Sequence, residues 1–255
     1  MKIAYFGIDL FADCLGLCLS AGFEVAKIFT FSNDPYDSVE KITQIAKEHN
    51  IPLVTQKVTK EDIAHLEEMG IQMMIVAGYA AKIPLSSKMM QVNIHPSLLP
   101  LGRGAWPMPV NILRGAPSGV TLHKLAEGFD TGDIILQREI PLAIDENLET
   151  LTAKVLKIAP EILGEFLKDP KGYFENATTQ GEGEYWQEPD DTDRTVFSNY
   201  TVEKADKILR AFYGYGVIYK GETECEILYG EVSETRPEGE FLPLENGYIR
   251  IKTTP

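Results

Sequence analysis

Short apolar runs alternate with helical stretches through residues 1 to about 170, and this alternation constrains the fold more than any other feature of the sequence. The apolar run at 2–7 (KIAYFG) is followed by a helical stretch at 9–21, and the run at 71–77 (IQMMIVA) is apolar on both faces. Strands that are apolar throughout are typical of a parallel sheet covered by helices on both sides. We therefore predict an α/β domain, doubly wound around a mostly parallel sheet.

The character of the chain changes at residue 172. Residues 172–194 are turn-rich and acidic and show no periodicity, whereas residues 201–212 have the pattern of an amphipathic helix and precede three short apolar runs. A β region of about 40 residues buries little surface on its own. We predict a main domain at 1–180, a linker at 181–200, and a helix with a small, truncated barrel-like β subdomain at 201–255.

The net charge limits the class of partner. The chain carries 24 Lys and Arg against 38 Asp and Glu, a net charge of −14, and residues 181–255 hold 16 of the acidic residues. Proteins that bind RNA or DNA present a basic surface that displaces counterions from phosphates, so this charge disfavours a nucleic-acid partner. The sequence lacks both a basic leader and an apolar run of the roughly 18 residues that a membrane helix needs, and we expect a cytoplasmic protein without a membrane partner.

Asn93 and His95 are the first candidates for a functional site. They are two residues apart in the predicted strand 91–95, so both side chains emerge on the same face of the sheet. A stiff loop, residues 96–104 (PSLLPLGRG), follows directly. Ligands of open α/β sheets bind beyond the carboxyl ends of the strands, which is where these residues fall. The plainer alternative is that both side chains only hydrogen-bond the loop backbone.

Other site chemistries find less support. His95, His123 and Asp130 are metal-ligand types, but the two histidines are 28 positions apart and zinc sites commonly place two ligands close in sequence, so we expect no metal. Ser97 lacks the G-x-S-x-G context of a serine nucleophile. The first turn, FGIDLF, lacks the G-x-G-x-x-G spacing of a nicotinamide site.

Two segments, NIHPSLLPLGRG (93–104) and SGVTLHKLAEGFDTGDII (118–135), resemble the signature of the 10-formyltetrahydrofolate-dependent formyltransferases. The resemblance implies a Rossmann-like catalytic domain within residues 1–180, with 10-formyltetrahydrofolate as co-substrate and no metal. It also implies that Asn93, His95 and Asp130 form the catalytic triad. The residues that match the family's pterin-binding segments are Ala81, Lys82, Ile83, Ala126, Glu127, Gly128, Phe129 and Asp130.

The implied reaction suits these residue types. A substrate amine attacks the formyl carbon, and the negative charge that gathers on the formyl oxygen meets two donors, the Asn93 amide and a protonated His95 ring. Asp130 would raise the pKa of His95, orient the ring, and help to remove the proton of the incoming amine. A module that binds folate without turnover is the alternative from another class, and the intact triad disfavours it.

The family's acceptors are glycinamide ribonucleotide, methionyl-tRNA, water and nucleotide-linked amino sugars. The RG after SLLP and the extension beyond residue 180 resemble the tRNA and sugar enzymes. The tRNA enzymes carry a basic loop after the second strand and a basic C-terminal barrel, whereas here the loop is 32–37 (SNDPYD) and the tail is acidic. A nucleotide-linked amino sugar is therefore the expected acceptor, as in the formyltransferase domain of the bifunctional aminoarabinose enzyme. Ala105 departs from that enzyme, which has Arg there, and agrees with the tRNA enzymes.

Arg103 and His123 are candidates for contacts to the acceptor. A guanidinium suits a diphosphate, although an Arg in a surface loop is more often solvated. His123 has the alternative of filling cross-strand space beside Thr121. A homodimer that covers the small β region is a further expectation.

Overall fold

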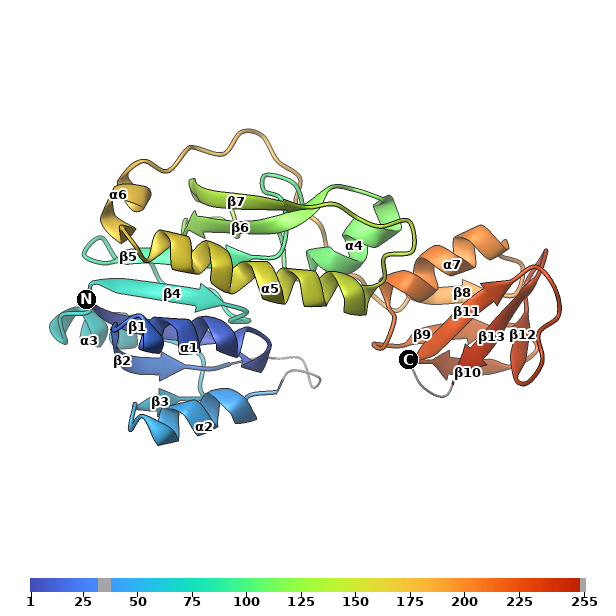
Figure 1. The fold of residues 1–255 in the computed structure, drawn as a ribbon, viewed down its shortest axis with the longest axis horizontal. Coiled ribbons are helices and arrows are strands. Elements are labelled where there is room, and N and C mark those ends of the chain that lie inside the picture. Colours follow the sequence, from blue (N-terminus) through green and yellow to red (C-terminus); the bar gives the residue numbers. More distant parts are fainter. Residues whose placement is uncertain (32–37, 253–255) are drawn as a thin grey trace. The chain divides into compact units, whose positions relative to one another are not determined.

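The computed structural model of the chain describes residues 1–31 and 38–252. Its main sheet has seven strands in the order β3-β2-β1-β4-β5-β6-β7 (Figure 1). The strands are β1 (Lys2–Gly7), β2 (Glu24–Phe29), β3 (Leu53–Val54), β4 (Met73–Ala77), β5 (Met90–His95), β6 (Ser118–Lys124) and β7 (Ile134–Ile140). The pairs from β3 to β5 are parallel and β5 pairs with β6 antiparallel, which confirms the predicted mostly parallel sheet.

Helices cover both faces of this sheet, as the apolar strands predict. On one face, Ala4 and Phe6 of β1 pack in a buried cluster with Ile63 and Leu66. On the other face, the Tyr5 hydroxyl donates to the carbonyl of Phe11 at 2.8 Å. The helical elements before residue 176 are η1 (Asp9–Phe11), α1 (Ala12–Ser20), α2 (Glu40–Glu48), α3 (Lys60–Glu68), α4 (Pro107–Arg114), α5 (Leu148–Phe166) and α6 (Pro170–Glu175).

Local signals explain where single helices begin and how closely they pack. Thr59 and Asp62 form a capping box at the start of α3, in which each side chain accepts from the other residue's backbone N–H. Gly164 of α5 lies against Leu17 of α1, and the two helices run side by side in front of the sheet in Figure 1. No helix of the part that the structure describes is long and apolar enough to cross a membrane.

The chain divides into two compact units. The first comprises residues 1–103, 119–139 and 155–184, and the second comprises 104–118, 140–154 and 185–255. The C-terminal elements are β8 (Thr195–Phe197), α7 (Val202–Ala211), β9 (Val217–Lys220), β10 (Glu224–Ile227), β11 (Tyr229–Ser233), β12 (Phe241–Pro243) and β13 (Tyr248–Lys252).

The predicted C-terminal helix and β-rich region are therefore present. They form two three-stranded sheets, β10-β9-β8 and β11-β13-β12, and the Tyr219 hydroxyl of the first donates to the Pro243 carbonyl of the second at 2.7 Å. Thr201 caps α7, and α7 packs on α4 within the second unit. The predicted linker at 181–200 contains β8. This strand pairs with β9 and is therefore part of a C-terminal sheet. The division at residues 180 and 200 stays a prediction.

Candidate active site

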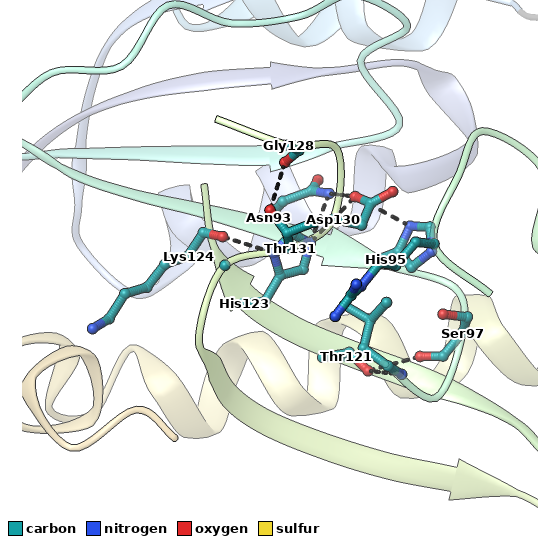
Figure 2. A network of polar contacts seen from close by, with 12 residues as sticks. Asn93, His95, Ser97, Thr121, His123, Lys124, Gly128, Asp130 and Thr131 are labelled. Carbon is teal, nitrogen blue, oxygen red and sulfur yellow. Dashed lines mark hydrogen bonds and ion pairs between the residues drawn. The ribbon is translucent and has the colours of Figure 1, made fainter. Parts of the chain in front are cut away.

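Asn93, His95, His123 and Asp130 come together at the carboxyl end of β5 (Figure 2). β5 and β6 are antiparallel with Asn93 opposite His123 and His95 opposite Thr121. Directly opposed residues of paired strands share a face and lie close together, so the pairing adds His123 to the predicted trio. The four side chains belong to the first compact unit.

One carboxylate oxygen is the centre of this cluster. Asn93 Nδ2 donates to Asp130 Oδ1 at 3.3 Å and lies 3.2 Å from His123 Nε2. The same Asp130 oxygen is 3.7 Å from His95 Nδ1 and 3.5 Å from His123 Nε2. An amide donor, two ring nitrogens and a carboxylate therefore converge within a few ångströms, as a site for general acid–base chemistry requires.

Backbone carbonyls determine the tautomers of both histidines. His123 Nδ1 lies 2.7 Å from the Lys124 carbonyl oxygen, and His95 Nε2 lies 2.7 Å from the Gly102 carbonyl oxygen. A carbonyl only accepts, so each of these nitrogens carries the proton. With the proton on Nδ1, Nε2 is the ring nitrogen of His123 that accepts from Asn93. In His95 the other nitrogen, Nδ1, is the one that faces Asp130.

Burial dominates the electrostatics of His95, whose side chain is 5% exposed. Desolvation lowers the pKa of His95, while Asp130 and the Gly102 carbonyl raise it by less and the charge of His123 lowers it further. The expectation that Asp130 gives His95 a raised pKa was therefore right for that one contribution and wrong for the net direction. With its pKa below 6.5, the ring is mostly neutral at pH 7, and it is not the protonated donor that the sequence led us to expect.

This lowered pKa makes stability depend on pH. The unfolded chain binds a proton at its free histidine more readily than the folded chain binds one at His95, so protons favour the unfolded state. We expect the free energy of unfolding to fall as the pH drops through about 6.5, by up to about 1.4 kcal/mol per pH unit, until the folded pKa is reached. Urea unfolding of wild type and His95→Gln between about pH 7.5 and about pH 5.5 measures this, and the variant should show the weaker dependence. Equal slopes would contradict the assignment.

Side-chain hydrogen bonds hold the loop that follows β5. The Thr121 hydroxyl donates to the Ser97 carbonyl at 2.7 Å and accepts from the Leu99 N–H at 3.2 Å. Gln137 Nε2 donates to the Leu99 carbonyl at 2.6 Å and to the Thr121 hydroxyl at 2.9 Å. The Ser97 hydroxyl donates to the Leu101 carbonyl at 2.8 Å, which makes it a loop residue and not a nucleophile.

Asp130 lies in a tight loop between β6 and β7. Its backbone has a φ of 55°, a left-handed conformation that Asp tolerates better than most residues. The Gly128 carbonyl accepts from the Thr131 hydroxyl at 3.0 Å. A Cβ at Gly132 would overlap the Lys124 carbonyl, so only glycine allows the loop to close this tightly on β6.

The two segments predicted to hold the pterin lie beside each other. Lys82 and Glu127 form an ion pair at 3.8 Å that joins residues 81–83 to residues 126–130. Ile83 is buried, whereas Phe129, next to Asp130, is 55% exposed. Their role in binding stays a prediction.

Arg103 and His123 have protein partners in the structure. The Arg103 side chain donates from Nε and Nη2 to Gln180 Oε1, at 3.1 and 2.8 Å, and His123 is 2% exposed between Asn93 and the Lys124 carbonyl. Gln180 is a residue that the sequence analysis missed, because it lies in a segment without periodicity, 50 positions after Asp130.

Within residues 1–31 and 38–252, no group of three or more His, Cys, Asp or Glu side chains is arranged to hold a metal ion.

Comparison with known proteins identifies the family. The family model described as Formyl transferase matches residues 2–167. A methionyl-tRNA formyltransferase from Ehrlichia ruminantium (strain Welgevonden) is 30% identical over 194 residues, which are 73% of this chain and 63% of that protein. A methionyl-tRNA formyltransferase from Thermosipho africanus is 28% identical over an alignment of 282 residues that covers 99% of this chain and 90% of that protein. The chain thus spans less than two thirds of the Ehrlichia protein.

Solved structures show the same fold. A sugar N-formyltransferase from a Shewanella species has a TM-score of 0.70 and 19% identity, and the match covers 93% of this chain and 99% of that one. An N-formyltransferase from Helicobacter canadensis, solved with folinic acid and dTDP-3-aminofucose, has a TM-score of 0.73 and 18% identity over 98% of both chains. The phosphoribosylglycinamide formyltransferase from Bacillus halodurans matches 68% of this chain with a TM-score of 0.55 and 28% identity.

Proposed function

The chain belongs to the formyl transferase family, and we propose that it transfers a formyl group from 10-formyltetrahydrofolate to a primary amine. The observation that supports this most directly is the convergence of Asn93, His95 and Asp130 at one carboxylate oxygen, with contacts of 3.3 and 3.7 Å. The ion pair between Lys82 and Glu127 supports a pterin site next to this cluster, since it joins the two segments that resemble the family's pterin-binding segments.

In the proposed reaction, Asn93 turns one of its two Nδ2 protons from Asp130 Oδ1 to the formyl oxygen as negative charge develops there, and it keeps the other on His123 Nε2. His95 keeps its Nε2 proton, which it donates to the Gly102 carbonyl. The His95 nitrogen that exchanges a proton is therefore Nδ1, which faces Asp130. Asp130 accepts the proton that the amine loses when its nitrogen bonds to the formyl carbon. That proton reaches N10 of the folate when the bond between N10 and the formyl carbon breaks, so the step is balanced without any further reactant.

The burial of His95 suits this proton transfer. A ring with a lowered pKa is neutral before the reaction and is a stronger acid once it is protonated. His123 supports the same arrangement, because its Nε2 accepts from Asn93. Two partners, His123 and Asp130, therefore orient the amide group of Asn93.

The acceptor that we propose is the amino group of a nucleotide-linked amino sugar. The net charge of −14 supports a small acceptor over tRNA, since a basic surface is what tRNA phosphates require. Nearly complete mutual coverage with the Shewanella sugar N-formyltransferase supports it at the level of the fold.

Methionyl-tRNA is the second candidate, favoured by the 28% identity to the Thermosipho enzyme along 99% of this chain and by Ala105. The loop at 32–37, which the sequence analysis used against tRNA, lies outside the described residues.

A competition between acceptors tests this choice. Wild-type protein receives formyl donor in excess together with nucleotide-linked amino sugars and charged initiator tRNA. We expect the formyl group on the sugar amine, with the tRNA unmodified. Formyl incorporation into the tRNA would reject the sugar acceptor and favour the second candidate, and binding of folate without any formylated product would indicate a binding module.

A further inference from the structure

Residues 178–184, named here the 178–184 strap, connect the two loops of the site. The strap begins at Thr178, which exchanges two backbone hydrogen bonds of 2.8 Å with Ile134 of β7. It then runs past the Asp130 loop and ends at Glu184, whose carbonyl accepts from the Arg103 N–H at 3.2 Å. The strap, the cluster, the Asp130 loop and residues 96–103 of the loop after β5 all lie in the first compact unit.

Gln180 uses its whole side chain to join these loops. Its Nε2 donates to the backbone carbonyls of Asp130 and Gly132, at 2.8 and 2.6 Å. Its Oε1 accepts twice from the Arg103 guanidinium, at 3.1 and 2.8 Å. A primary amide has two donor protons and two acceptor lone pairs, so these four contacts satisfy it completely.

The other end of the connection reaches the residue that holds His95. Arg103 donates to the Gly181 carbonyl at 3.1 Å, and its neighbour Gly102 supplies the carbonyl on which His95 Nε2 rests. The strap lies so close to this loop that a Cβ at Gly183 would overlap the Pro100 carbonyl. One side chain, Gln180, therefore connects the backbone of Asp130 with the loop that anchors His95.

We propose that Gln180 is a positioning residue that sets the separation between Asp130 and His95. It does not touch the reacting atoms, and it acts through the carbonyl of Asp130 and through Arg103. The backbone of Asp130 is in the left-handed region, where tertiary contacts must hold it, and the Gln180 contact is one that does so. The inference rests on the proposed function, because it assigns Gln180 to the same reaction.

Two substitutions separate the two ends of the side chain. Gln180→Leu removes all four hydrogen bonds, whereas Gln180→Glu keeps an acceptor for Arg103 but sets a carboxylate against two carbonyls. Gln44→Leu on α2 is the matched control, because Gln44 is exposed and bonds only to Glu48 among the contacts described. We expect both Gln180 variants to lose about 10- to 100-fold in kcat with KM nearly unchanged, since small displacements of reacting groups have effects of this size. The control should keep wild-type kcat.

A second readout does not depend on turnover. The chain has only four histidines, so nuclear magnetic resonance resolves the titration of His95 from that of the others. The titratable groups that face His95 are Asp130, which raises its pKa, and His123, which lowers it. If Gln180 holds Asp130 in place, Gln180→Leu should lower the pKa of His95 while His49 and His65 titrate as in wild type. An unchanged or raised His95 pKa, or a wild-type kcat in both variants, would overturn the inference.

The two readouts separate this inference from the proposed function. If wild-type protein formylates no amine, the proposed function fails while the His95 titration still tests whether Gln180 positions Asp130. If wild type formylates its acceptor and the Gln180 variants match it in kcat and in titration, the proposed function stands and the inference fails.

Discussion

Asp130→Asn should leave a folded protein that has lost about 100- to 10,000-fold in kcat, the contribution that general acid–base catalysis usually makes. The substitution keeps the size of the side chain but removes the carboxylate that contacts Asn93, His95 and His123 together. Asn also tolerates the left-handed backbone with φ of 55° that residue 130 adopts, so we expect the loop to stay folded in the variant. Steady-state formyl transfer at saturating donor and acceptor measures the loss.

Asp133→Asn is the matched control for this change. Asp133 lies three residues later and pairs with Lys124 at 3.0 Å, outside the cluster of four side chains. Its variant should transfer formyl groups at nearly the wild-type rate. Near-normal kcat in Asp130→Asn, or an equal loss in both variants, would show that Asp130 is not the proton acceptor.

Asn93→Ala should lower kcat about 100- to 1000-fold, because it removes the amide donor that meets the developing oxyanion. The substitution also takes away the amide nitrogen that contacts Asp130 Oδ1 and His123 Nε2, at 3.3 and 3.2 Å. The loss should appear in kcat more than in KM, since the donor strengthens its contact only as charge develops on the oxygen.

Asn176→Ala provides the control for a lost asparagine amide. Asn176 is exposed, and its Nδ2 donates only to the Gly172 carbonyl at 2.8 Å among the contacts described. This variant should keep wild-type kinetics. The double variant Asn93→Ala with Asp130→Asn should lose far less than the product of the single losses, because residues that act as one unit are not additive. A fully multiplicative loss would contradict a shared cluster.

The part of the site that depends on local spacing was predictable from the sequence. Asn93 and His95 share a face because alternate residues of a strand do so, and the adjoining loop could be identified from its prolines and glycines. The mostly parallel sheet also followed from strands such as β4, in which all five residues are buried. These features need no knowledge of which strand pairs with which.

What depends on pairing between distant segments did not follow from local patterns, and Asp130 was grouped with Asn93 and His95 only through the family resemblance. His123 joins the cluster because β6 runs antiparallel to β5 in a register that sets it opposite Asn93, and no local pattern specifies that register. Gln180 joins through contacts 50 and 77 positions away. The net pKa direction of His95 also needed the structure, because burial, which the sequence does not show, outweighs Asp130.

Mass spectrometry of the acceptor is the most direct test of the central claim that this cluster drives formyl transfer to an amine. Wild-type protein and Asp130→Asn are each incubated with 10-formyltetrahydrofolate and a nucleotide-linked amino sugar, and the sugar is then analysed. We expect an N-formylated sugar from the wild-type reaction and little or none from the variant in the same time. An unmodified sugar in both reactions, or equal formylation in both, would contradict it.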